Sequence, residues 1–295
     1  MTSSSNKSLP RPASQVFTSR MPETTTITCS DLDETIRRYT RELGYRLDMI
    51  MPADAPREAL LRKPDHKGGL ILRVRQEPSL PYGPLPSEWT IGRAGMIYRD
   101  LIPDRLGGKL VASHIRIVNG GEVPDSVHYH KIDFQIIYCL KGTIRVVYED
   151  QGEPFWLRPG DCVLQPPEIR HRVLEAEGGS EVIEITSPSD HETWFDHETQ
   201  LPTSHVRPER FFGTQCFVRH LDSDAIWKPL DIGERLFADT EFAAAGDVMP
   251  EVYVLRARDG NEELVEYAET SGLFLRILIA GRGIELRGRT SRTTI

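Results

Sequence analysis

Short stretches rich in β-branched and aromatic residues recur about every ten positions between Lys109 and Thr186. Glycine and proline turns separate them, as at Gly120-Gly121 and Pro159-Gly160. The predicted strands cover 109–118, 135–140, 143–148, 154–157, 161–165, 172–175 and 180–186. Strands of this length and spacing are typical of an antiparallel sandwich or barrel, so the sequence predicts a mainly β protein.

Three histidines fall within this run of strands. His128 and His130 form a His-x-His pair, and alternate residues of a strand face the same side, so both imidazoles can point into the interior. His171 follows about forty positions later, after Gly160-Asp161 and Pro166. Neutral imidazoles bind divalent metals and three of them leave positions open for a substrate. The alternative is that these are ordinary surface or core histidines.

The spacing around these histidines resembles the first motif of the cupin superfamily. Gly121 is followed by six residues, then His128-Tyr129-His130, four residues, Gln135, six residues and Gly142. The second motif is also matched. Gly160 is followed by five residues, then Pro166-Pro167-Glu168, two residues and His171. The resemblance covers about Lys109 to Ser187.

The cupin resemblance implies a cupin-type antiparallel β-barrel, also called a double-stranded β-helix. It implies that His128, His130, Gln135 and His171 hold one divalent metal ion. Gln135 stands where the family usually has Glu, and Glu168 where it usually has Gly. We predict Gln135 as a catalytic residue that coordinates weakly or hydrogen-bonds a bound water, because its neutral amide cannot act as a general base. A neutral donor leaves the metal more positive and strengthens its Lewis acidity.

This site suits two reactions. We predict an oxygenase that binds iron and a small organic substrate. The alternative is a non-redox cyclase or isomerase of a polyketide-like carbonyl compound, with zinc, nickel or manganese as other candidate metals. A third hypothesis is a non-catalytic cupin that binds a small molecule. His114, Arg116 and Tyr138 are predicted to line the substrate cavity. His191, His197 and His205 are interpreted as part of a solvated linker, with an accessory metal cluster as the alternative.

The residues before this region predict a different unit. A strand at 24–29, a helix capped by Ser30 and ending at Gly44, and strands at 45–51, 58–62 and 69–74 give a βαβββ order. This α+β module resembles one module of the vicinal-oxygen-chelate superfamily, which includes glyoxalases, although Ile27-Thr28-Cys29 lacks the usual metal-binding histidine. We predict a structural or dimerising role, so a homodimer is a candidate assembly.

A weak internal repeat follows Pro208. An offset of 139 residues carries Gly121 onto Gly260 and Gly142 onto Gly281. The same offset maps His128 to Tyr267 and Gln135 to Phe274, and the counterpart of His171 would lie beyond Ile295. The sequence therefore predicts a bicupin-like chain whose partial second cupin-like unit has lost its ligands. Such a unit exposes an open sheet face unless another element or subunit covers it.

Composition and charge limit the kinds of partner that this chain can bind. The net charge of −8 and the lack of a Lys/Arg stripe argue against nucleic acid. No apolar run is long enough to span a membrane. Four scattered cysteines predict reduced core residues in a cytoplasmic protein.

The sequence features above divide the chain into six segments. They are a disordered tail (1–22), for which a transit peptide is the alternative, a vicinal-oxygen-chelate-like module (23–77), a proline-rich linker (78–88), a metal-binding cupin domain (89–190), a connector (191–207) and a degenerate, incomplete cupin-like unit (208–295).

Overall fold

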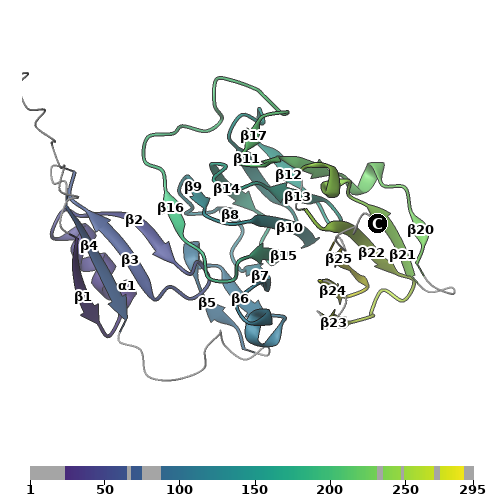
Figure 1. Ribbon diagram of the computed structural model, residues 1–295, viewed down its shortest axis with the longest axis horizontal. Helices are drawn as coiled ribbons and strands as arrows, with labels where there is room; N and C mark the ends of the chain where they lie inside the picture. The colour runs from purple at the N-terminus through teal and green to yellow at the C-terminus, as the bar shows by residue number, and fades with distance from the viewer. Residues whose placement is uncertain are drawn as a thin grey trace, which may run out of the picture.

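The computed structural model describes residues 24–64, 68–74, 88–230, 235–246, 249–268 and 273–288. The predicted tail and almost all of the predicted linker lie outside these residues. The described chain is mainly β and contains one α-helix. Figure 1 shows an N-terminal sheet at the left, a central domain, and a C-terminal sheet at the right. No helix of the described part is both long and apolar enough to cross a membrane.

The N-terminal segment has the predicted βαβββ order. Its elements are β1 (Thr25–Cys29), α1 (Leu32–Arg41), β2 (Arg46–Met51), β3 (Glu58–Arg62) and β4 (Gly69–Val74). β2, β3 and β4 form an antiparallel meander, and β1 pairs with β4 in parallel. Asp31, not the predicted Ser30, is the N-cap, because its carboxylate accepts a hydrogen bond of 2.8 Å from the backbone N–H of Glu34.

The N-terminal sheet continues without interruption into the central domain. β2 pairs with β16 (Thr193–Phe195), and β16 pairs with β9 (His128–His130). The same sheet then contains β14 (His171–Ala176), β11 (Ile144–Tyr148) and β12 (Phe155–Leu157), with β8 (Gly121–Glu122) beside β14. β16 lies in the segment predicted as a connector, so that segment supplies a strand that joins two predicted domains.

A second sheet faces the first in the central domain. Its order is β19 (Val218–His220), β13 (Cys162–Gln165), β10 (Phe134–Lys141), β15 (Ser180–Ser187), β7 (Val111–Ile117), β6 (Ile97–Asp100) and β5 (Thr90–Ile91). An apolar core that includes Ile115, Val146, Leu157 and Val163 lies between the two sheets. The described strands form two facing sheets of a jelly-roll-like fold, and their hydrogen bonds do not close them into one continuous barrel.

A buried arginine ties the N-terminal segment to the central domain. Short 3-10 helices occur at η1 (Arg93–Gly95), η2 (Pro103–Leu106), η3 (Asp222–Asp224) and η4 (Phe242–Ala244). Arg105 in η2 is 1% exposed and donates from Nε to Asp100 at 2.8 Å. The same guanidinium forms an ion pair with Asp54, which lies in the turn between β2 and β3. Loss of this arginine would leave two carboxylates without their counter-charge.

The C-terminal sheet covers the outer face of the second sheet. It has six antiparallel strands in the order β20 (Lys228–Pro229), β21 (Arg235–Asp239), β22 (Glu251–Ala257), β25 (Arg282–Arg287), β24 (Phe274–Ile279) and β23 (Leu264–Ala268). A small hairpin of β17 (Phe211–Phe212) and β18 (Gln215–Cys216) precedes it. Val254, Ile277 and Ile284 pack there in one core cluster with Ile136 and Tyr138 of β10. The open sheet face expected from the sequence is thus covered by the central domain of the same chain.

The two halves of the predicted internal repeat differ in how their strands pair. Gly142 and Gly281 both adopt positive φ, 69° and 71°, at the ends of corresponding strands. β24 and β25 pair as neighbours in one sheet, whereas β10 and β11 belong to opposite sheets. The description of residues 208–295 as a reduced cupin unit stays a prediction.

Candidate metal centre

Three histidines meet at one end of the space between the two sheets. Residues alternate along β9, so His128 and His130 lie on the same face, and His171 at the start of β14 pairs directly with His128. One ring nitrogen of each histidine lies within 4.8 Å of the others. All three side chains are buried. The sequence prediction that these three histidines come together is consistent with this geometry.

The other nitrogen of each ring is held in place. Nδ1 of His128 donates to the carbonyl oxygen of Ser126 at 2.7 Å, and Nδ1 of His171 donates to that of Ile169 at 2.9 Å. Nδ1 of His130 lies 2.9 Å from the hydroxyl oxygen of Thr193 in β16. A proton fixed on Nδ1 leaves the lone pair on Nε2, which is the arrangement of metal-binding histidines.

The unpaired nitrogens fit a metal ion. Nε2 of His128 is buried and has no hydrogen-bond partner among the described residues. Burial lowers the pKa of His128 and of His130 well below the ordinary range, with the charge of Arg93 and the neighbouring imidazoles acting in the same direction. Burial lowers the pKa of His171 to about 4. The three rings are therefore neutral at pH 7, the form in which imidazole binds a divalent metal.

Gln135 lies beside this cluster but its carbonyl oxygen is engaged. Gln165 of β13 pairs with Gln135 across the sheet and donates from Nε2 to Gln135 Oε1 at 2.5 Å. Nε2 of Gln165 also lies 3.4 Å from Nε2 of His171, and Tyr148 donates its hydroxyl hydrogen to Gln165 Oε1. The structure thus places Gln165 next to both Gln135 and His171. The predicted role of Gln135 as a ligand stays a prediction.

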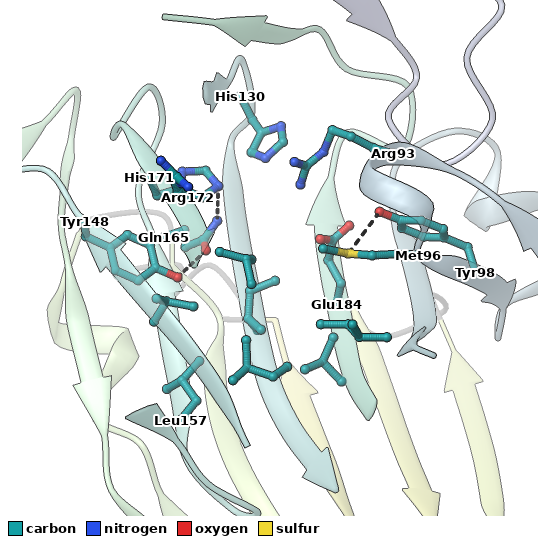
Figure 2. A pocket seen from close by; sticks show the side chains of 16 residues that line it. Arg93, Met96, Tyr98, His130, Tyr148, Leu157, Gln165, His171, Arg172 and Glu184 are labelled. Carbon is teal, nitrogen blue, oxygen red and sulfur yellow. Dashed lines mark hydrogen bonds between the residues drawn. The ribbon is translucent and has the colours of Figure 1, made fainter. Parts of the chain in front are cut away.

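A cavity opens beside the histidines (Figure 2). Its volume is about 60 Å³. Much of its wall is apolar. The polar residues that line it are Arg93, Tyr98, His130, Tyr148, Gln165, His171, Arg172 and Glu184. Arg93 forms an ion pair with the buried Asp125, and its Nε has no hydrogen-bond partner among the residues that the structure describes. A small ligand with an oxygen donor at one end and an apolar body would match this lining.

Glu184 is a charged group inside this cavity that the sequence reading missed. It lies on β15, where Ile137 and Ser113 are its partners on the neighbouring strands. Burial raises the pKa of its carboxyl to about 7, and the positive charge of Arg93 partly opposes that rise. Its sequence signal is an acid between two apolar residues, Ile183 and Ile185, in a strand that is mostly buried.

The other sequence candidates lie elsewhere. His114 and Arg116 line a second cavity of about 640 Å³, which the C-terminal sheet also borders. There Arg99 donates to His114 Nδ1 at 3.0 Å, and His114 donates from Nε2 to Glu181 at 2.7 Å. Tyr138 points away from the histidines into the core shared with the C-terminal sheet. The predicted lining role of His114 and Arg116 would therefore concern this second cavity.

The histidines of the predicted connector differ in their surroundings. His191 is buried and its ring centroid lies 5.3 Å from that of His130, so it does not belong to a solvated linker. His197 Nε2 lies 3.0 Å from the carbonyl oxygen of Leu47 in β2. In the described residues the metal-type cluster contains His128, His130 and His171 and none of the connector histidines.

Comparison with known proteins agrees with this architecture. Residues 114–186 match the family model of the cupin domain. The fold of this region is that of a cupin domain. The match lies within the stretch for which the sequence resembles cupins, so that prediction is confirmed. The likeness of the N-terminal module to glyoxalases stays a prediction.

Solved structures similar to the chain include two oxalate decarboxylases. The Bacillus subtilis enzyme OxdC, as a deletion mutant, is 15% identical with a TM-score of 0.42, over 71% of this chain and 75% of that chain. The Lactobacillus farciminis enzyme in its formate complex is 13% identical with a TM-score of 0.43, over 71% and 83%. KdgF from a Halomonas species is 25% identical with a TM-score of 0.28, over 34% and 87%. Likenesses at these TM-scores assign no chemistry to this chain, and no curated protein matches it.

Proposed function

We propose that this protein is a metal-dependent cupin enzyme that acts on a small organic substrate. The observation that carries this proposal is the convergence of three neutral, buried imidazoles, each with one ring nitrogen within 4.8 Å of the others, while Nδ1 of His128 and of His171 is anchored on a backbone carbonyl oxygen. They lie beside a largely apolar cavity. A structural metal would be surrounded by protein ligands, whereas a three-histidine set leaves coordination positions for a substrate.

The donor set suits a borderline divalent ion, and we propose iron, with zinc, nickel and manganese as alternatives. His128, His130 and His171 would hold it. Gln135, whose carbonyl oxygen already accepts a hydrogen bond from Gln165, is proposed as a weak additional donor through its second lone pair. When bound, such an ion supplies Lewis acidity and binding positions for oxygen donors. The rest of the site is built by the protein. Arg93 provides positive charge near the histidines, and the apolar wall excludes water from the substrate.

We propose the oxygenase as the reaction class. Three neutral histidine ligands would leave room on such an ion for a chelating substrate and for dioxygen. The cyclase or isomerase is the second candidate, and one observation favours it. A carboxyl whose pKa burial raises to about 7, on Glu184, lines the same cavity and suits proton transfer.

Metal analysis tests the first part of the proposal. Protein purified without added ions should contain close to one divalent metal per chain, and a double variant, His128→Ala with His171→Ala, should contain none. Wild-type protein that neither holds metal nor takes up added metal would contradict the proposal. Dioxygen consumption by the loaded protein with 1,3-diketones, flavonoids or thiols then separates the two reaction classes. Product formation without dioxygen consumption would favour the cyclase or isomerase.

A further inference from the structure

Glu184 is the one acidic side chain among the sixteen described residues that line the cavity of the metal centre. It stands on β15, between β10 and β7, in the sheet that faces the histidine-bearing strands. Figure 2 shows its carboxylate directed into the cavity, below Arg93 and beside Met96, with His130 and His171 toward the upper end. A ligand that fills this cavity at the histidines would therefore share the space with this carboxylate.

The carboxyl of Glu184 is not committed to a structural contact. It forms no hydrogen bond or salt bridge within the described residues. Arg93, which lines the same cavity, is paired with Asp125, and Asp125 also accepts a hydrogen bond of 2.9 Å from the backbone N–H of Val173. A buried carboxyl with a purely structural role normally has hydrogen-bond or ion-pair partners for its oxygens, because an unpaired one destabilises the fold. This one faces free space.

The lining indicates what kind of ligand fits beside it. Arg93 and Arg172 contribute positive charge, and three imidazoles offer a place for a divalent ion. A carboxylate next to a carbonyl oxygen would match that end, because both oxygens can bind a metal and an arginine. The rest of the lining is largely apolar, with Ile137 and Leu157 among its residues. The small volume, about 60 Å³, limits the apolar part to a short alkyl group.

We propose that Glu184 is the general acid–base residue of this cavity, acting on a short 2-oxo carboxylate or a similar chelating carbonyl compound. This inference rests on the proposed function. The Glu184 carboxylate takes a proton from the carbon next to the carbonyl group. The electron pair of that C–H bond forms the carbon–carbon double bond of an enolate, and the carbonyl π pair moves to the oxygen at the histidine end. The carboxyl then returns the proton to carbon. No oxidant or reductant is needed, and either proposed reaction class can begin with this step.

The electrostatics agree with this geometry. A proton-transfer group works best when its pKa lies near the working pH, and burial brings the pKa of Glu184 to about 7. The titratable and charged groups that line the cavity with it are Arg93, Tyr98, His130, Tyr148, His171 and Arg172, and the charge of Asp54 also acts on its carboxyl. Burial raises the pKa of both tyrosines, which are therefore neutral at pH 7. Arg93 and Asp54 are the charged neighbours that tune the carboxyl.

The test measures hydrogen–deuterium exchange of the methyl group of pyruvate in D₂O by NMR, using protein loaded with zinc as a redox-silent ion. Wild-type protein should exchange this methyl group, at a rate that rises as pH passes through about 7. Glu184→Gln should lower the rate by about 100-fold or more and should remove the pH dependence. Glu184→Asp should restore part of the rate. Glu175→Gln, on β14 and outside the cavity, is the matched control and should behave as wild type.

Metal content is measured on each sample, so the two proposals fail separately. Absence of metal binding in wild-type protein overturns the proposed function. A zinc-loaded wild-type protein that exchanges no pyruvate protons overturns the inference while leaving the metal centre intact. Glu184→Gln protein that is folded, loaded and as fast as wild type also overturns it. A folded, loaded and slow Glu184→Gln protein with a normal Glu175→Gln control supports it.

Discussion

Replacement of Glu184 by glutamine should stabilise the protein, and the gain should depend on pH. Burial raises the pKa of this carboxyl from its ordinary value of 4.5 to about 7. Below pH 4.5 the side chain is protonated in both the folded and the unfolded chain, so it contributes no penalty. Between pH 4.5 and about 7 only the folded chain keeps the proton, so stability falls as pH rises, and above about 7 the full penalty remains. The shift corresponds to a penalty of roughly 3 kcal/mol.

Urea unfolding of metal-free protein at pH 5 and pH 8 measures this effect. Glutamine has nearly the same shape as a protonated glutamate and carries no charge, so the two proteins should differ little at pH 5. At pH 8 the Glu184→Gln variant should be more stable by roughly 3 kcal/mol. The buried histidines titrate in both proteins, and comparing the two cancels their contribution. A difference in stability that is the same at pH 5 and pH 8 would refute the reasoning, since it would mean that Glu184 ionises normally in the folded chain.

Three further predictions concern the metal centre and the contact between the parts of the chain. The double variant His128→Ala with His171→Ala should lose at least 100-fold in zinc affinity by chelator competition, and an unchanged affinity would rule out these imidazoles as ligands. Gln135→Glu should tighten zinc binding at neutral pH by adding an anionic donor, whereas no change would place this side chain outside the coordination sphere. Arg105→Leu should lower the free energy of unfolding by about 3–5 kcal/mol in urea, because it leaves two buried carboxylates unpaired; a loss below 1 kcal/mol would count against that role.

The local pattern of the chain was sufficient for part of this structure. The period of two in a strand places His128 and His130 on one face, and the structure has both in β9. The predicted strand at 180–186 corresponds to β15, Ser180–Ser187. Helix and strand order of the N-terminal segment was also read correctly, with the N-cap misplaced by one residue. These features depend on neighbours in sequence, so local propensity and spacing determine them.

Features set by distant pairing could not be read in this way. Gln165 reaches Gln135 because β13 and β10 pair in a particular register, which no local pattern specifies. Glu184 and Arg93 meet at the cavity from elements far apart in sequence. Alternation along β10 implies that Tyr138 and Gln135 face opposite sides, but not that another sheet covers the Tyr138 side. Strand β16 has three residues, too few for a recognisable period.

The position of β16 limits where the chain can be cut into fragments that keep the metal centre. β16 closes a gap between β2 and β9, and its Thr193 holds Nδ1 of His130. A fragment ending at residue 190 would retain every cupin motif, yet it would lack the strand that orients one of the three imidazoles and would expose two sheet edges. The boundary that the motifs suggest therefore runs through the metal centre. A piece suited to expression must therefore begin with the N-terminal sheet, continue past Phe195 and keep the C-terminal sheet that covers β10.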